Sequence, residues 1–148
     1  SMRNPVWMLV LLLLVLPGLL AAGEKKLMHC FMFTRIEAAA DADWQAFFKA
    51  TDELPGNIPG LSRVWYGKLR APFAVINTDG ATRKKLAGGE KDVTGPVSRL
   101  VRVWGVCMEM ADEAGLKTYA AHPAHKAWEE VYGKVRQPGT TTFDLLGQ

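Results

Sequence analysis

Two histidines and a tyrosine lie within seven residues, in the segment Tyr119-Ala-Ala-His122-Pro-Ala-His125, and the chain has one further histidine, His29. Histidine titrates nearest to neutral pH among the side chains, so this group is the first place to look for proton transfer. A neutral imidazole accepts a proton from a carbon acid or a hydroxyl, and a neighbouring phenol polarises a carbonyl oxygen. These residue types indicate acid–base chemistry on a carbonyl compound, provided that the fold brings His29 to the others.

The three histidines differ in what their positions favour. His122 precedes a proline and sits where a helix would begin, so we expect it to cap that helix. His125 is the candidate general base, with Tyr119 as its partner. The alternative for both is structural, with His125 bonded to backbone and the Tyr119 ring packed while its hydroxyl reaches water. His29 lies in an aromatic, apolar run, which is equally consistent with a packed core residue.

Three histidines are also a known set of zinc ligands. No acidic residue adjoins the His-Pro-Ala-His segment to orient such a ligand, since Glu129 and Glu130 follow a helical turn later. Haem ligation through His125 is a further alternative that no other residue singles out. We therefore predict neither a metal nor a bound cofactor.

Residues 1–23 have the composition of a targeting segment. Ser1-Met2 reads as a cloning scar, Arg3 supplies a positive charge, and an apolar run from Val6 to Leu16 leads to small residues. These are the features of a secretory signal peptide, so we expect an exported protein, periplasmic or secreted. The alternative is an uncleaved membrane anchor, because the apolar stretch approaches the roughly 20 residues that a membrane helix needs. Pro17-Gly18 argues against a straight span.

Residues 24–148 are enough chain for a single domain. The formal charge of +3 falls to +2 without Arg3, too mild to indicate a nucleic-acid partner, and the one basic cluster, residues 83–85, is typical of a solvated loop. Cys30 and Cys107 are an even count in an exported chain, which permits a disulfide. Both lie in apolar runs, where free cysteine packs as a small hydrophobe, so we favour free thiols.

The hydrophobic pattern predicts an alternation of strands and helices. Strand segments are rich in aromatic and β-branched residues, and helical segments repeat their apolar residues at a helical spacing. We expect Asp41 or Asp43 to cap the first helix and Pro55-Gly56 to stop it. The predicted strands are 27–36, 61–69, 100–110 and 140–146, and the predicted helices are 41–54, 112–121 and 123–132.

This order, β-α-β-β-α-β, predicts an α+β fold of the ferredoxin-like type with one antiparallel sheet. The first strand is apolar on both faces, yet helices would cover only one of them. Exposed apolar patches of that size typically mark an interface, so we predict a homodimer formed through the open sheet face. Residues 71–99 do not fit the pattern and form a long insertion, either a lid over the histidine site or a tolerated surface segment.

Several motifs occur together in one order along the chain. His29 begins an aromatic run, Ile58-Pro59-Gly60 forms a turn, Gly67 ends the second strand, and Tyr119-x-x-His122-Pro123-x-His125 follows. In this combination the chain resembles the stress-responsive A/B barrel (Dabb) family over most of residues 27–146. The resemblance implies a ferredoxin-like protomer and a dimer whose two sheets form an α/β barrel.

Most members of this family have no assigned reaction, so activity does not follow from the resemblance. One plant branch includes a polyketide cyclase, which closes a ring by aldol condensation, and its pocket residues fall on His29, Tyr119 and His125. That enzyme has a further pocket tyrosine in helix one, where this chain has Ala50-Thr51. We expect these three residues to line a pocket for a small hydrophobic or aromatic molecule. The alternative is a cyclase-like lyase or isomerase with His125 as general base.

Overall fold

A computed structural model describes residues 25–148, and the predicted leader, residues 1–23, lies outside them. Within the described chain no helix is long and apolar enough to cross a membrane. The elements, in chain order, are β1 (Leu27–Phe33), α1 (Asp41–Asn57), β2 (Leu61–Thr78), α2 (Gly80–Ala87), β3 (Val97–Met110), α3 (Glu113–Ala121), α4 (Pro123–Tyr132) and β4 (Thr141–Leu146).

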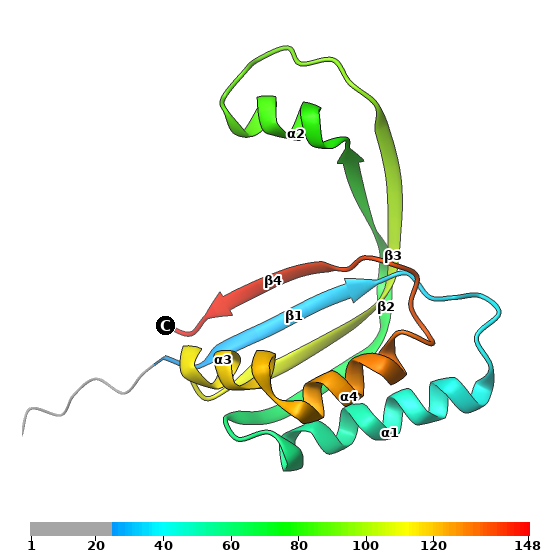
Figure 1. Cartoon of the computed structure of the whole chain (residues 1–148), viewed down its shortest axis with the longest axis vertical. Helices are drawn as coiled ribbons and strands as arrows, with labels where there is room; N and C mark the ends of the chain where they lie inside the picture. Colours follow the sequence, from blue (N-terminus) through cyan, green and yellow to red (C-terminus); the bar gives the residue numbers. More distant parts are fainter. Residues whose placement is uncertain (1–24) are drawn as a thin grey trace, which may run out of the picture.

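The four strands form one antiparallel sheet in the order β2-β3-β1-β4. Helices α1, α3 and α4 cover one face of the sheet, and among residues 25–148 no helix covers the other face (Figure 1). The α+β, ferredoxin-like arrangement predicted from the order of elements is therefore confirmed. The additional helix, α2, belongs to the segment that did not fit the pattern.

The core lies between the sheet and these helices. Alternate residues of β1 point toward the helices, so Phe31 and Phe33 are buried there. Thr51 joins α1 to α4, because its hydroxyl donates to the carbonyl of Phe47 at 2.6 Å and accepts from the indole N–H of Trp128 at 2.9 Å. Burying each large apolar side chain of this core contributes roughly 1.5–3 kcal/mol. The hydrogen bonds of Thr51 add a directional contact that fixes the position of α4 against α1.

Helix α1 differs from its prediction at both ends. Its N-cap is Ala40, without a side-chain cap, and the two aspartates lie in its first turn, where carboxylates favour the helix dipole. The helix passes through Pro55 to Asn57 instead of stopping at Leu54. Leu54 and Ile58 are each 1% exposed, and the N–H of Ile58 bonds to the carbonyl of Leu54 at 3.0 Å. Burial of Ile58 thus holds a last turn that local sequence signals would end.

A close contact between two glycines sets the start of α3. Gly60, in the Ile58-Pro59-Gly60 turn, has a φ of 86°, and a Cβ there would lie 2.8 Å from the Cα of Gly115. The carbonyl of Gly60 also accepts a bond from the N–H of Ala111 at 2.7 Å. Only glycine suits a positive φ with this approach, so the turn fixes where α3 begins and hence where its residue Tyr119 lies.

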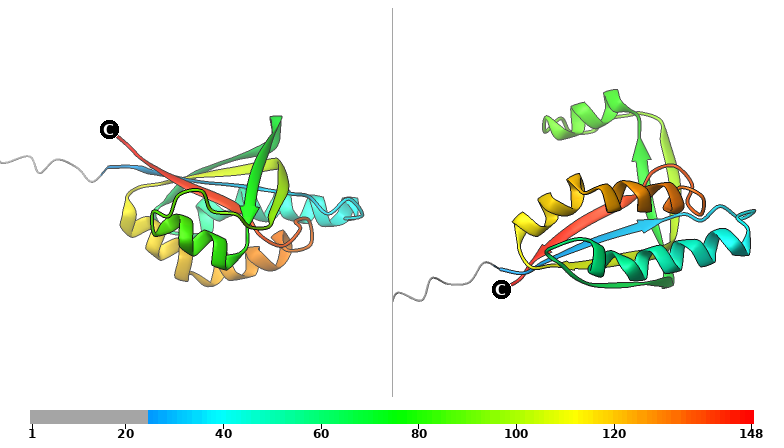
Figure 2. Two further views of the ribbon diagram at one scale, coloured as in Figure 1. Left: turned by 90° about the horizontal axis from the view of Figure 1, so that it is seen from above. Right: turned by 60° about the horizontal axis from the view of Figure 1, so that its bottom comes forward.

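Residues 71–99 form an arm rather than an irregular insertion. Strands β2 and β3 run beyond their predicted ends at residues 69 and 100 and stay paired up to Thr78 and Val97, with an irregularity after Lys68. Asp79 then caps α2 by accepting a bond from the N–H of Thr82 at 2.7 Å. The arm bends away from the sheet and carries α2 at its far end (Figures 1 and 2). A lid function remains a prediction.

The expectation of free thiols is wrong. Cys30 of β1 and Cys107 of β3 are direct partners in the antiparallel register, with Cα atoms 4.2 Å apart, and they form a disulfide. The apolar runs that favoured free thiols carry no information on register. Pairing of β1 with β3 is what brings two residues 77 positions apart into contact.

Candidate functional site

The fold brings His29, Tyr119 and His125 to one cavity. The His29 ring lies 5.7 Å from the Tyr119 ring, which lies 4.1 Å from the His125 ring, measured between centroids. The cavity has a volume of about 380 Å³ and opens between α3, α4, β1 and β4. Its remaining lining residues are mostly apolar or aromatic with a few polar groups at the edge: Phe31, Leu116, Ala120, Trp128, Glu129, Tyr132, Thr140 and Thr142.

His122 lies outside this lining and caps α4, as predicted. Its Nδ1 accepts a bond from the N–H of Ala124 at 3.1 Å, and Pro123 occupies the first helical position, where no N–H is needed. The break between α3 and α4 at this cap places Tyr119 in the last turn of one helix and His125 in the first turn of the next. The cap therefore helps to position the rings of Tyr119 and His125, although His122 itself does not line the cavity.

His29 has a partner that the sequence did not reveal. Asp144 of β4 lies opposite His29 in the antiparallel register, and its Oδ1 is 2.7 Å from the histidine Nδ1. A carboxylate only accepts, so Nδ1 carries the hydrogen of this bond, and in the neutral imidazole Nε2 then holds the lone pair. An imidazole oriented in this way by a carboxylate is suited to act as a base. The available signal was a single acidic residue in the otherwise uncharged strand segment 140–146.

His125 is less firmly held. Its Nε2 lies 3.7 Å from Oε1 of Glu129, one helical turn later, which is too long for a hydrogen bond. Its ring packs between two aromatic rings. The Tyr119 ring is tilted against it at 4.1 Å between centroids, and the Trp128 ring is stacked on it at 5.9 Å. His125 is thus placed by packing, whereas His29 is placed by a hydrogen bond.

The hydroxyl of Tyr119 is available to donate a hydrogen bond to a ligand in this site. Burial raises the pKa of its phenol, and the nearby carboxylate of Glu129 raises it further, so the hydroxyl keeps its proton at neutral pH. A protonated phenol beside an oriented imidazole can hold a carbonyl oxygen while the imidazole removes a proton.

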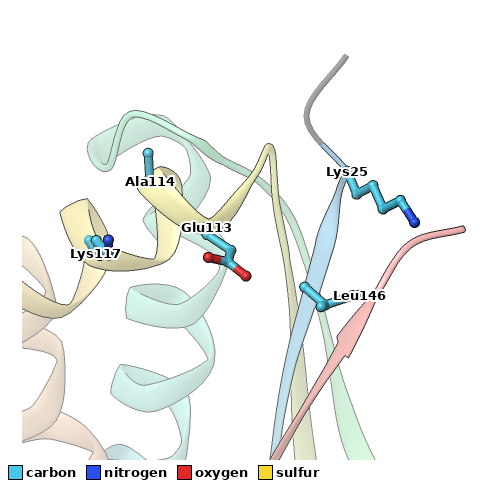
Figure 3. Close-up of a pocket in the computed structure, with 5 residues that line it drawn as sticks. All are labelled: Lys25, Glu113, Ala114, Lys117 and Leu146. Carbon is cyan, nitrogen blue, oxygen red and sulfur yellow. The ribbon is translucent and has the colours of Figure 1, made fainter. Parts of the chain in front are cut away.

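A second cavity, of about 410 Å³, lies between the start of α3 and the end of β4 (Figure 3). It is lined by Lys25, Glu113, Ala114, Lys117 and Leu146, and contains no histidine or aromatic ring. Across residues 25–148 no group of three or more His, Cys, Asp or Glu side chains is arranged to hold a metal ion. The cavity with the two histidines is therefore the better candidate for chemistry.

No protein-family model matches the sequence, and no curated protein matches it either. Solved structures match its fold. A Dabb family protein with a ferredoxin-like fold from Mesorhizobium loti is 15% identical, with a TM-score of 0.54 over 84% of this chain and 99% of that one. A dimeric ferredoxin-like protein of unknown function from Thermobifida fusca is also 15% identical, with a TM-score of 0.53 over 83% and 92%.

A hydroxynitrile lyase from Passiflora edulis is 7% identical, with a TM-score of 0.56 over 84% of this chain and 94% of that one. Identities this low establish the fold alone. The chain therefore has the ferredoxin-like fold of Dabb proteins, as its motifs indicated.

Proposed function

We propose that the protein binds a small aromatic or hydrophobic carbonyl compound in the cavity that contains His29, Tyr119 and His125. The observation that carries this proposal is the convergence of these three side chains, from β1, α3 and α4, on one cavity. Its 380 Å³ lies within the roughly 300–1,000 Å³ of small-molecule sites. The aromatic wall suits a flat ligand, and the imidazoles and phenol form its polar end.

Labelling the histidines with carbon-13 at Cε1 tests this proposal, because only three resonances are expected. Titration with 4-hydroxybenzaldehyde should shift the signals of His29 and His125. His122 serves as the control within the same chain, because its ring caps α4 outside the cavity lining and its signal should not move. Three unchanged signals, or three equal shifts, would contradict binding at this cavity.

A second candidate is a lyase or isomerase that uses this site for proton transfer. Asp144 favours His29 as the base, alongside the His125 that the motif suggested. In this scheme the Tyr119 hydroxyl donates to the carbonyl oxygen of the substrate, and Nε2 of His29 takes the proton from the neighbouring carbon. The electron pair left on that carbon is delocalised onto the oxygen. One solved structure of this fold is named a lyase, which supports this class of reaction.

Exchange of the methyl protons of acetophenone in heavy water separates catalysis from binding. The protein should accelerate the exchange above the buffer rate, and His29→Ala and Tyr119→Phe should each abolish most of the acceleration. An exchange rate equal to that of buffer, with histidine signals that still shift on binding, would leave the binding proposal standing and remove the enzymatic one.

We infer that the protein is a homodimer formed through the open sheet face. A row of four residues crosses this face in register, and Trp65, Cys107, Cys30 and Phe143 are its members. Trp65 is 79% exposed and Phe143 43%, which is unusual for large apolar side chains on a sheet. The related T. fusca protein is described as dimeric, which supports this inference.

Light scattering coupled to gel filtration tests the dimer. Trp65→Glu should convert the protein to monomers, because it places a charge in the apolar row at its most exposed member. Leu146→Glu is the matched control, since Leu146 is also exposed but pairs with Leu27 on the helix-facing side of the sheet. A Trp65→Glu protein that keeps the mass of a dimer would contradict this interface.

We infer export from the features of residues 1–23, and the Cys30–Cys107 disulfide supports this, because disulfides persist in oxidising compartments. Expression of the full chain in a bacterial host, followed by fractionation and mass spectrometry, tests it. A shortened chain in the periplasm is the expected result. A full-length chain in the membrane fraction would favour the uncleaved anchor instead.

A further inference from the structure

A second group of polar side chains adjoins the candidate cavity. Arg102 is only 4% exposed, yet its guanidinium bonds to two neutral hydroxyls, Thr34 Oγ1 at 3.0 Å and Thr141 Oγ1 at 3.2 Å. Among residues 25–148 it forms no ion pair with a carboxylate. A buried charge is costly without a partner of opposite sign, so an anion close to Arg102 would be stabilised.

Tyr132 is the second polar residue of this group. It lines the cavity and is 5% exposed, and its buried hydroxyl oxygen has no hydrogen-bond partner among residues 25–148. The guanidinium carbon of Arg136 lies 4.7 Å from the centre of this ring, and Nε of Arg136 is likewise buried and unpartnered. Nε of Arg136 is a donor and the phenol hydroxyl can donate, so an acceptor oxygen would satisfy both groups.

Both arginines act on the Tyr132 phenol. Burial raises the pKa of this group, and the positive charges of Arg136 and Arg102 oppose that rise. The position of the Arg136 guanidinium over the ring, at 4.7 Å, accounts for the larger of these two effects. The phenol keeps its proton, because burial is the largest influence. The region therefore combines two positive charges with a neutral donor.

The aromatic wall connects this region with the histidines. Phe31 lies between His29 and Tyr132, at 5.8 Å and 5.5 Å between ring centroids. Trp128 makes a parallel connection, with its ring 5.9 Å from that of His125 and 4.7 Å from that of Tyr132. Through either Phe31 or Trp128, a single aromatic ring separates an imidazole from Tyr132. A small substituted benzene is long enough to span this separation.

We propose that the cavity is specific for an aromatic carboxylate, whose carboxylate lies toward Tyr132, Arg136 and Arg102 and whose opposite end faces His29. This proposal rests on the proposed binding function and names its ligand class. A carboxylate supplies both the negative charge and the acceptor oxygens that these donors lack. A water molecule would supply an acceptor but no charge.

Two probes of nearly equal shape test the proposal by calorimetry. 4-Acetylbenzoate and 4-acetylbenzamide carry the same ketone and differ in charge at the other end of the ring. We expect the acid to bind about tenfold more tightly than the amide, since hydrogen bonds to a charged group are the stronger ones. Arg136→Gln should weaken binding of the acid by roughly tenfold and leave binding of the amide unchanged, whereas Tyr132→Phe should weaken binding of both, because an amide oxygen also accepts from the phenol.

Arg99→Gln is the matched control, because it removes one positive charge from an exposed position on the arm and should change neither affinity. Melting temperatures verify folding, and Tyr132→Phe, which removes only the hydroxyl, decides the outcome if Arg136→Gln unfolds. Equal affinity for acid and amide, with no effect of Tyr132→Phe, overturns the carboxylate site and leaves the binding function intact. Failure of both probes to bind overturns both.

Discussion

Asp144 accepts a hydrogen bond from Nδ1 of His29 at 2.7 Å, across the pairing of β4 with β1. The bond decides which ring nitrogen of His29 holds the proton, and it leaves the other as the acceptor. In the described part of the chain His125 has no comparable partner, because the carboxylate of Glu129 lies 3.7 Å from its Nε2. The better oriented imidazole of this site is therefore on the strand and not in the His-Pro-Ala-His segment.

Removal of Asp144 should release the His29 ring from a single tautomer. In the wild-type protein, nitrogen-15 shifts of neutral His29 should report a protonated Nδ1. In Asp144→Ala they should report a mixture in which Nε2 is mainly protonated. Glu129→Ala is the control, since it removes a carboxylate of the same site and should not change the His29 shifts. A wild-type His29 protonated at Nε2 would refute the orientation described above.

The sequence predicted the parts of the fold that local patterns encode. An aromatic-rich run without proline or glycine located β1, and the cap formed by His122 was predicted from its place before Pro123 and confirmed. The four-stranded ferredoxin-like sheet followed from the order of elements. Tyr119 and His125 were recognisable as candidates because they lie in one segment, but the helix break between them left their distance open.

The missed features depend on contacts between distant residues. Asp144 and Cys107 meet their partners on β1 only through the sheet register, which no pattern within one strand reveals. The last turn of α1 depends on the burial of Ile58, which outweighs the local signal of Pro55. Arg102 was read as part of a strand, and its lack of a carboxylate partner became visible only once its neighbours were known.

Thr51 should stabilise the protein through its bond with Trp128. Thr51→Val keeps the shape of the side chain but removes the acceptor of a buried indole N–H, so we expect the free energy of unfolding to fall by about 1–3 kcal/mol. Urea unfolding followed by circular dichroism measures the change. Thr118→Val, on the exposed side of α3, is the control and should stay within about 0.5 kcal/mol of wild type. A Thr51→Val protein as stable as this control would show that the bond contributes nothing.

The Cys30–Cys107 disulfide should contribute substantially to stability. It closes a long segment, with a sequence separation of 77, and so restricts the unfolded chain. Loop-entropy arguments give about 4 kcal/mol for a segment of this length. The double variant Cys30→Ala/Cys107→Ala should lose about this amount in denaturant unfolding. Wild-type protein with reductant should match it, whereas the double variant itself should not respond to reductant.

Tyr66 should make the protein less stable at high pH. Burial and its hydrogen bond to Asp52, 2.9 Å long, raise the pKa of this phenol to about 12 in the folded state. An unfolded tyrosine ionises near pH 10, so between these values the folded state holds a proton that the unfolded state has lost. The contribution is complete below pH 10 and disappears as the pH rises to about 12.

The difference in unfolding free energy between wild type and Tyr66→Phe isolates this contribution from the other tyrosines. That difference should be constant below pH 10 and should change in disfavour of the wild type from there to about pH 12. Absorbance at the phenolate band should show one ionisation fewer at high pH in the folded variant. A pH-independent difference would mean that Tyr66 ionises alike in both states.

The outer part of the arm should be dispensable for folding. Thr78 and Val97 form its last strand pair, and α2 beyond them buries only Thr82. Replacing residues 79–96 with Asn-Gly, which suits a two-residue hairpin turn, should therefore leave the melting temperature unchanged.

The same variant tests whether the arm acts as a lid over the cavity. If α2 closes over the cavity, limited proteolysis of wild type at the basic residues 83–85 should slow when ligand binds, and the shortened variant should release 4-acetylbenzoate faster. Identical proteolysis and identical release would assign the arm to another task.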